Sequence, residues 1–216
     1  MKQAQKDFWL REHNFRRYTH PIVRYFSMQR VNFLRNFIKI GGLKNILDVG
    51  AGEGFSSFYL QEICQDVVAT DLSRKMLIKN PVKKKIIADI YSLPFRSGSF
   101  DMVCAWEVLH HLDNHETAVE EVIRVSKRYA CIFEVNRDNP VQFLFGIIDK
   151  EHRGAIRFSK KYLLKLFDKK ARIIGHATTG VIFPNKTPSF IFPFLSKINF
   201  VMPFIGISNF IICEKS

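Results

Sequence analysis

A short apolar run that enters a glycine cluster is the feature of this sequence that most restricts its fold. The run Ile46 to Val49 is followed by Gly50, Gly52 and Gly54, and a helix-like stretch from Phe55 to Cys64 comes next. Glycines at such a point let a backbone approach a ligand closely and leave the N–H groups of the next helix pointing outward. The segment therefore predicts a strand, a ligand-binding bend and a helix in direct succession.

The same alternation of short apolar strands with helices continues along the chain. Helices are expected at Ser73 to Lys79, Thr117 to Val125 and Ser159 to Phe167. Further strands are expected at Val67 to Thr70, Lys85 to Ala88, Met102 to Trp106, Tyr129 to Val135, Ala171 to Val181 and Asn209 to Glu214. Because parallel strands need long crossover connections, this alternation predicts an α/β fold with a parallel sheet covered on both faces.

Length and glycine placement divide the chain into a core domain and an N-terminal extension. With 216 residues, the chain can bury one substantial core but is too short for two ordinary domains. Residues 1–43 are predicted as a basic helical extension, in which a helix from Ile22 to Ile40 ends at Gly41 and Gly42. Residues 44–216 are predicted as the ligand-binding domain on which this extension packs.

The net charge of +13 is concentrated at the N-terminus. Residues 1–44 contain ten Lys or Arg against Asp7 and Glu12, an excess of +8. Such a segment attracts phosphate groups on nucleic acid, on a lipid surface or on a substrate, although a solvated helix face explains the same charges.

No targeting or membrane-spanning segment is expected, and the protein is predicted to be cytoplasmic. Charges interrupt every apolar stretch at the N-terminus, so a signal peptide is not indicated. The longest uncharged run, Ile198 to Cys213, contains Pro203 and is shorter than the ~20 residues needed to span a bilayer. The four cysteines are widely spaced, which disfavours both a disulfide framework and a zinc motif.

The residues around the glycine cluster favour a cationic nucleoside over a dinucleotide. A dinucleotide fingerprint requires glycine at its sixth position, where this sequence has Phe55 when counted from Gly50. Asp48 would repel a pyrophosphate but attract the ammonium and sulfonium of S-adenosylmethionine. Asp71 lies 21 residues after Gly50, at the end of the next strand, where a carboxylate accepts ribose hydroxyls.

Three spaced motifs then appear in order: ILDVGAGEG, ATDLSRKML and ADIYSLPFRSGSFDMVCAWEVLHHL. Over about residues 44–136 the chain resembles class I S-adenosylmethionine-dependent methyltransferases of the branch that methylates small molecules. The resemblance implies a doubly wound, Rossmann-like, mostly parallel seven-stranded sheet with an antiparallel last strand. It also implies a cofactor site of Asp48, Gly50, Ala51 and Gly52 at the methionine end, Asp71 and Leu72 at the ribose, Met76, Asp89 and Ile90 at the adenine, and Trp106 beside the sulfonium.

Methyl transfer from a sulfonium is an in-line displacement that requires alignment and exclusion of water but no metal, and no metal is expected here. His110 and His111 form the adjacent titratable pair near the expected methyl position, so they are the candidate general bases. Either ring could instead pack against the sheet or bind the cofactor. Glu107 is a weaker candidate, since a carboxylate there could equally cap a helix.

The segments after the fifth strand point to an apolar acceptor. Acceptor-side insertions are expected at about residues 137–158 and 183–207, the second as a phenylalanine-rich flap. Polar groups for a head group are expected from Glu134, Asn136, Arg137 and Asn139, with an apolar wall from Phe143, Leu144 and Phe145. The hypothesis is a lipid, lipid-linked or other small-molecule acceptor, approached through the basic N-terminal helix at an anionic membrane surface.

Several alternatives stay open on the sequence alone. The fourth strand lacks an Asn-Pro-Pro-Tyr or Asp-Pro-Pro-Tyr run, and Cys104 has no adjacent proline, so methylation of adenine, glutamine or cytosine is disfavoured. An RNA methyltransferase is still an alternative, because Phe8, Trp9, Phe15 and Tyr18 alternate with Arg11, Arg16 and Arg17. A non-catalytic partner that binds S-adenosylmethionine is another, and an oxidoreductase is poorly supported.

Overall fold

The computed structural model describes residues 15–203 and 205–215, with the backbone alone for residues 150 and 151. Its sheet has the strand order β3-β2-β1-β4-β5-β7-β6. Strand β7 runs antiparallel to both of its neighbours, whereas β1 to β5 pair in parallel, which confirms the predicted α/β architecture. The strands are β1 (Ile46–Val49), β2 (Val67–Asp71), β3 (Lys84–Ile87), β4 (Phe100–Trp106), β5 (Ser126–Val135), β6 (Arg172–Thr179) and β7 (Ser208–Glu214).

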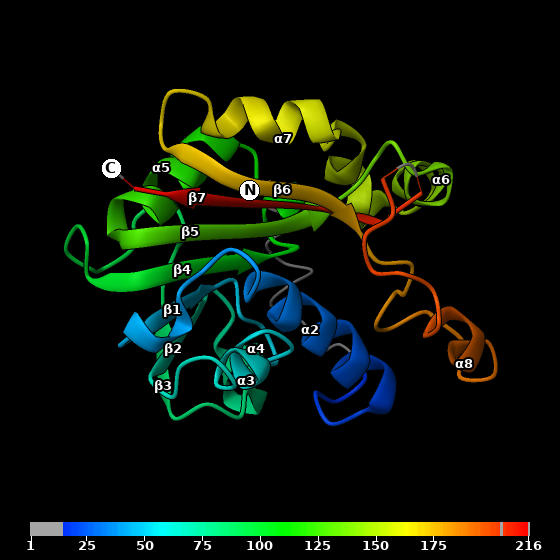
Figure 1. Ribbon diagram of the computed structural model, residues 1–216, viewed down its shortest axis with the longest axis horizontal. Coiled ribbons are helices and arrows are strands. Elements are labelled where there is room, and N and C mark those ends of the chain that lie inside the picture. The colour runs from blue at the N-terminus through cyan, green and yellow to red at the C-terminus, as the bar shows by residue number, and fades with distance from the viewer. Residues whose placement is uncertain (1–14, 204, 216) are drawn as a thin grey trace.

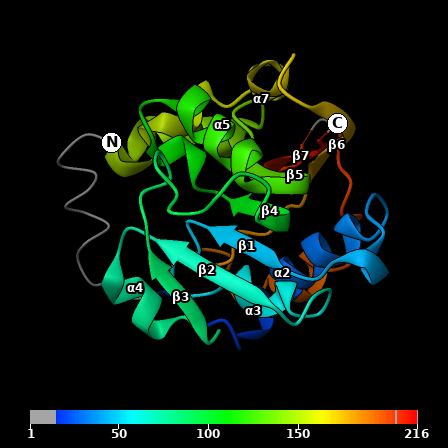
Figure 2. The same ribbon diagram turned by 90° about the vertical axis from the view of Figure 1, so that its left-hand side faces the viewer.

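Helices cover both faces of this sheet. Helices α5 and α7 lie on one face, and α2, α3 and α4 lie on the other (Figures 1 and 2). The α-helices are α2 (Pro21–Leu34), α3 (Ser57–Leu60), α4 (Arg74–Lys79), α5 (His115–Val125), α6 (Pro140–Ile148), α7 (Lys160–Phe167) and α8 (Phe192–Leu195). Short 3₁₀ segments are η1 (Ile40–Gly42), η2 (Leu109–His111) and η3 (Lys150–Arg157).

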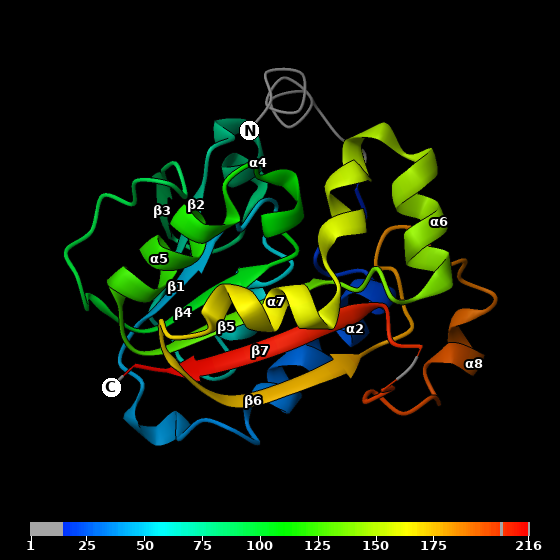
Figure 3. The ribbon, with the colours of Figure 1, turned by 90° about the horizontal axis from the view of Figure 1, so that it is seen from above.

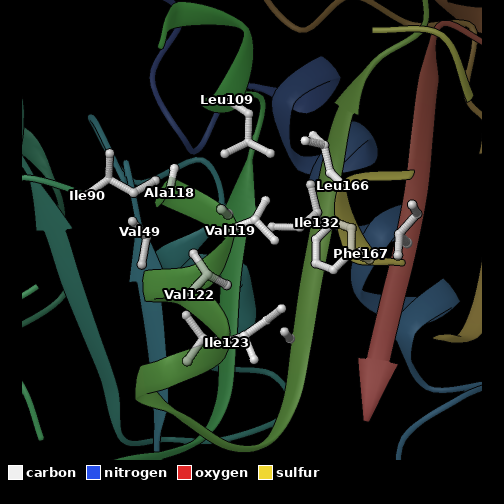
Figure 4. Close-up of a cluster of buried hydrophobic side chains, with 14 of the residues drawn as sticks. Val49, Ile90, Leu109, Ala118, Val119, Val122, Ile123, Ile132, Leu166 and Phe167 are labelled. Atoms are coloured by element: carbon white, nitrogen blue, oxygen red, sulfur yellow. The ribbon is translucent and has the colours of Figure 1, made fainter. Parts of the chain in front are cut away.

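Two hydrophobic cores form because successive strand residues point to opposite faces. In β4, Met102 and Cys104 pack in the core under α2 and α3, whereas Val103 and Ala105 pack in the core under α5 and α7. Figure 4 shows the second core, where α5 residues such as Val122 meet side chains from β1, β5 and α7. Burying α5 and α7 in this way holds the carboxyl ends of the central strands in place.

The N-terminal helix is shorter than predicted. Helix α2 ends at Leu34 and not at Ile40, because the chain turns there and the N–H of Phe37 donates to the Leu34 carbonyl at 2.9 Å. The Phe37 ring lies 5.7 Å from the Phe210 ring, and a Cβ at Gly175 would come within 2.4 Å of it. Packing of Phe37 on β6 and β7 therefore overrides the helical spacing of the apolar residues.

Two other helices differ from the expected boundaries. Helix α3 covers Ser57–Leu60, less than the predicted Phe55 to Cys64, and hydrogen-bonded turns continue the chain to Cys64. Helix α6 lies inside a segment for which only an insertion was predicted. Its start follows ordinary capping rules, since the Asn139 side chain accepts from the backbone N–H of Gln142 and Pro140 occupies the first turn.

No helix in residues 15–203 and 205–215 combines the length and the apolar character needed to cross a bilayer.

Candidate active site

A cavity of about 490 Å³ opens at the carboxyl ends of β1, β2 and β4. The strand order reverses between β1 and β4, and ligands of doubly wound sheets bind at such a switch point. The volume lies within the range typical of small-molecule sites. We call the end beside β1, β2 and β3 the cofactor half, and the end beside η2, α6, η3 and Phe183 the acceptor half.

Every residue predicted for the cofactor site except Asp48 lines this cavity, and so do the two candidate bases. These residues are Gly50, Ala51, Gly52, Asp71, Leu72, Met76, Asp89, Ile90, Trp106, His110 and His111. Residues from three separate motifs are therefore brought together at one sheet edge, as their positions after successive strands required.

The glycine bend after β1 allows a close approach that no other residue permits. Gly50 and Gly52 have φ angles of +69° and +50°, in the left-handed region that favours glycine. A Cβ at Gly50 would lie 2.5 Å from Val108 Cγ2, and one at Gly52 would lie 3.0 Å from Met76 Cε. The bend therefore fits tightly between the start of η2 and α4 while its backbone faces the cavity.

Asp71 joins the glycine bend to the end of β2. Its two carboxylate oxygens accept from the backbone N–H groups of Gly52 at 2.9 Å and of Ser73 at 2.8 Å. Each oxygen has a second lone pair, so the carboxylate can still accept two ribose hydroxyls. Burial raises the pKa of Asp71, and these backbone bonds oppose the shift.

Asp48 lies behind the bend and not on the cavity wall. Its side chain is fully buried and accepts hydrogen bonds of 2.5 Å from the hydroxyls of Ser56 and Ser57. Burial raises the pKa of Asp48 to about 7, although the two serine hydrogen bonds favour the carboxylate. Asp48 therefore supports the bend through its hydrogen bonds with the two serines. Because it does not line the cavity, it can act on a ligand there only by electrostatic attraction.

His110 and Glu134 form a buried pair in the acceptor half. Nδ1 of His110 lies 2.8 Å from Oε1 of Glu134, and the backbone N–H of His110 donates to Oε2 at 2.8 Å. Burial raises the pKa of Glu134 to about 8 and lowers that of His110, so each group resists becoming charged. Nε2 of His110 is buried and has no hydrogen-bond partner within the described chain.

A third histidine, His152, was not predicted from the sequence. Its ring centroid lies 5.7 Å from that of His110 and 5.4 Å from that of His111. It comes from η3, which packs on η2 through Gly154, where a Cβ would lie only 1.7 Å from the His110 carbonyl oxygen. Gly154, two residues after His152, was the one local sign of a close backbone contact. Nothing in the sequence shows that this contact is with η2.

Arg30 was also missed, and it ties α2 to the end of β4. This fully buried guanidinium donates to Glu107 Oε1 at 3.0 Å and to Ser208 Oγ at 2.8 Å, and it stacks over the Phe26 ring. Burial lowers the pKa of Arg30 to about 10, so it stays cationic at neutral pH. Glu107 has φ +55°, a left-handed conformation that this ion pair stabilises. Burial raises the pKa of Glu107, and the charge of Arg30 opposes this shift.

Two of the polar residues expected to bind an acceptor head group form hydrogen bonds with backbone carbonyls instead. Nδ2 of Asn136 donates to the Gly206 carbonyl at 2.8 Å, and Nδ2 of Asn139 donates to the Ile205 carbonyl at 2.6 Å. Neither these two residues nor Arg137 nor Glu134 is among the residues that line the cavity. Gln142 and Phe145 line it in their place, because the α6 turn directs them inward.

The segment just before α2 closes the cavity against the predicted flap. The guanidinium of Arg16 donates to the carbonyls of Pro184 at 2.9 Å and of Thr187 at 2.8 Å. Phe15 and Phe183 line the cavity, and the Tyr18 ring packs 4.7 Å from the Phe58 ring. The described aromatic residues of this segment thus face the protein. Phe8, Trp9 and Arg11, which the RNA alternative also uses, lie outside the described residues.

The fold and this site together define a class of protein. A protein-family model described as a methyltransferase domain matches residues 47–132, which contain the glycine bend, Asp71, Asp89 and the two adjacent histidines. Over this stretch the chain therefore contains a methyltransferase domain, as the order of the three motifs implied.

The curated relatives are similar over part of their length. The chain is 28% identical over 142 residues to the demethylmenaquinone methyltransferase of Corynebacterium glutamicum, and 28% identical over 143 residues to that of Mycobacterium tuberculosis. Each match covers 65% of this chain and 57% of the relative. The chain therefore spans less than two thirds of these relatives.

Solved structures share the fold. An S-adenosylmethionine-dependent methyltransferase from Thermotoga maritima superposes with a TM-score of 0.70 over 90% of this chain and 91% of its own, at 17% identity. One from Archaeoglobus fulgidus superposes with a TM-score of 0.62 over 89% and 94%, also at 17% identity. At this identity the superpositions establish the architecture alone.

Proposed function

We propose that this chain transfers a methyl group from S-adenosylmethionine to a small apolar acceptor, which it meets at a membrane surface. The observation that supports this proposal is that one cavity has a polar end suited to a nucleoside and an aromatic end suited to an apolar molecule. The glycine bend and Asp71 form one end, and aromatic side chains such as Phe145 and Phe183 form the other. The name of the curated relatives makes a demethylated menaquinone, in its reduced quinol form, the first acceptor to test.

The cofactor half suits a cationic nucleoside. Asp71 offers acceptors for ribose hydroxyls, the bend at Gly50 and Gly52 leaves room for a ligand against the backbone, and Asp48 adds a carboxyl group behind it. When bound, S-adenosylmethionine supplies an activated methyl group, and S-adenosylhomocysteine is the product. The protein orients the two reactants and excludes water from the space between them.

The acceptor half combines an apolar wall with a few polar atoms. Val135, Phe145 and Phe183 line it together with Gln142 and His110. The role of His110 or His111 as general base stays a prediction. Nε2 of His110 suits that role, because Glu134 occupies the other ring nitrogen and Nε2 has no hydrogen-bond partner among the described residues.

Beside the acceptor half, an exposed surface on α6 and α8 suits contact with lipid. Figure 3 shows both helices at the same end of the molecule. The apolar members of this α6–α8 surface are Val141, Phe143, Leu144, Ile147, Ile148, Phe190, Phe194, Val201 and Ile205, each at least 44% exposed. Exposed cations accompany them at Arg137, Arg153, Arg157, Lys186 and Lys197. Such a combination favours peripheral binding to an anionic bilayer.

This surface replaces the basic N-terminal helix as the proposed membrane contact. Helix α2 buries Ile22, Phe26 and Arg30 in the protein core, and Arg24 is the one basic side chain of α2 that is exposed. The α6–α8 surface, in contrast, exposes several large apolar side chains, and α6 also lines the acceptor half of the cavity through Gln142 and Phe145.

The activity is tested with methyl-labelled S-adenosylmethionine, demethylmenaquinol in mixed micelles, and a fractionated cell extract. We expect label in the quinol and in the lipid fraction, and none with an Asp71→Ala variant. Label that enters RNA alone would favour the RNA methyltransferase alternative. Cofactor binding without transfer to any fraction would favour the non-catalytic partner and would refute the proposed activity.

Membrane contact is tested by sedimentation with vesicles that contain an anionic phospholipid. We expect the protein to sediment with them at low salt, and Leu144→Ser with Ile148→Ser to release it. The matched control is Ile78→Ser on α4, an exposed apolar residue at 62% that lies away from the α6–α8 surface. Equal vesicle binding by the two variants would exclude α6 as the contact.

A further inference from the structure

Three histidine rings meet in the acceptor half, and the reaction proposed above does not require all of them. The ligand-capable atoms of His110, His111 and His152 all lie within 4.8 Å of one another. His110 and His111 are buried, and His152 is half-buried. We propose that this cluster binds a divalent first-row transition ion, for which Zn²⁺ is the natural probe.

Carboxylates stand behind two of the three rings. Glu134 Oε1 lies 2.8 Å from Nδ1 of His110 in a hydrogen bond, whereas Asp149 Oδ2 lies 3.2 Å from Nδ1 of His152 without the geometry of a hydrogen bond. In metal sites a ligating imidazole commonly gives its second ring N–H to a carboxylate, which fixes the tautomer and orients the ring. His110 lines the cavity, and its Nε2 is buried and finds no hydrogen-bond partner among residues 15–203 and 205–215. A buried ring nitrogen without a hydrogen-bond partner is available to bind a metal ion.

The backbone brings the third ligand to the other two. Gly154 packs so closely on the His110 carbonyl that any side chain there would overlap it. Gly146 of α6 makes a similar approach to η3, since its Cβ would lie 2.9 Å from Ile156 Cγ2. Two glycines therefore hold η3 against η2 and α6, and this contact places His152 at the cluster.

The charges around the cluster leave room for a cation. Arg30 is neutralised by Glu107 at 3.0 Å, and Lys186 lies 3.8 Å from Asp149 and over the Phe145 ring. Glu134 has no cationic side chain as a partner other than a protonated His110 within the described residues. A bound divalent ion would supply the positive charge that this buried carboxyl group lacks.

The ligand set determines the class of ion. Three imidazole nitrogens with an open fourth position are typical of catalytic zinc sites, whose tetrahedral ligand atoms are about 3.4 Å apart. The three rings must therefore draw together on binding, which side-chain rotation of the half-buried His152 allows. The open position would accept an oxygen of the acceptor. A coordinated His110 could not also take up a proton, so metal binding would replace the general-base role predicted for it.

Binding is tested on the untagged full chain after treatment with a chelator. Calorimetry with Zn²⁺ should show one equivalent bound, and Co²⁺ should give the visible absorption of a four- or five-coordinate site. His152→Ala should weaken Zn²⁺ binding at least ten-fold, and Glu134→Gln should weaken it by about 10–100-fold. The matched control is His176→Ala, an exposed histidine on β6, which should bind Zn²⁺ like the wild type.

Binding of S-adenosylmethionine by the same preparations separates this inference from the proposed function. His152→Ala should keep cofactor binding, because His152 belongs to the acceptor half. Absence of stoichiometric Zn²⁺ binding in wild-type protein that binds S-adenosylmethionine would overturn the metal site and leave methyl transfer standing. Equal Zn²⁺ affinities for His152→Ala and His176→Ala would overturn it as well.

Discussion

The two halves of the cavity are built in different ways. The cofactor half consists of loops that directly follow β1, β2 and β3, and the backbone N–H groups of Gly52 and Ser73 hold Asp71 in it. The acceptor half collects side chains from α2, η2, α6, η3 and the Phe183 segment. A site built from backbone geometry can therefore be recognised from a short sequence motif. A cavity wall built from side chains that are far apart in the chain cannot. Substitutions at four places in the molecule test this contrast.

The largest effect is expected at Arg30, which joins α2 to the acceptor half. Arg30→Ala leaves Glu107 without its ion partner and should lower the free energy of unfolding by about 3–5 kcal/mol. Chemical denaturation measures this loss, and Arg35→Ala, at an exposed position one turn later, should change it by less than about 0.5 kcal/mol. Under conditions where the variant is folded, its affinity for S-adenosylmethionine should stay within a few-fold of wild type. A parallel collapse of cofactor affinity would show that the two halves are not separate.

The next effect is expected at the glycine bend. Gly50→Ala must adopt φ +69° and avoid Val108 at 2.5 Å, so it should displace the bend and weaken cofactor binding by about 2 kcal/mol or more, roughly 30-fold. Isothermal calorimetry with S-adenosylhomocysteine measures the loss. Gly98→Ala is the matched control, because φ there is +67° but its Cβ would meet no atom closer than 3.9 Å. Equal losses would mean that backbone strain, and not the shape of the bend, limits binding.

A smaller effect with a distinctive pH dependence is expected at Asp48. Burial raises the pKa of Asp48 to about 7, from the ordinary value of 3.8 that applies to the unfolded chain. The folded state therefore binds the proton more tightly, and this group lowers the free energy of unfolding as pH rises from about 4 to about 7, with no further loss above that range. Relative to Asp48→Asn, ligand-free wild type should lose at least about 1.4 kcal/mol across this range, since each pKa unit corresponds to about that energy.

Denaturation at a series of pH values measures the difference between the Asp48→Asn variant and the wild type. Ile78→Ser, which changes an exposed residue without a titratable group on α4, serves as the control and should show a flat difference. If the Asp48→Asn difference is equally flat, the cofactor half contains no carboxyl group whose ionisation opposes folding.

The smallest effect on stability is expected at the α6–α8 surface. Leu144 and Ile148 are 57% and 71% exposed, so replacing each with serine should change the free energy of unfolding by less than about 0.5 kcal/mol. Leu163→Ala, at a fully buried position on α7, should cost about 2–5 kcal/mol in the same assay. A large loss at Leu144 would indicate that α6 packs on protein and is unavailable to lipid.

Some expectations failed where tertiary contacts override local signals. The apolar spacing of Phe33, Phe37 and Ile40 continues past Leu34, yet the chain turns because Phe37 packs on β6 and β7. Asn136 and Asn139 looked available for a ligand, yet they hydrogen-bond the backbone at Gly206 and Ile205. In both cases the deciding partner is far away in the chain, so no local pattern records it.

The sequence by itself determined which residues come together in the cofactor half of the cavity. Gly50 follows β1, Asp71 ends β2 and Asp89 comes just after β3, and parallel strands bring their carboxyl ends to one edge, so the motif order was sufficient. Only the tertiary structure decided that Arg30 supports Glu107 and that His152 joins His110 and His111. Those contacts depend on how helices and loops pack over the sheet, and packing between distant segments leaves no periodic signal in the residues that make it.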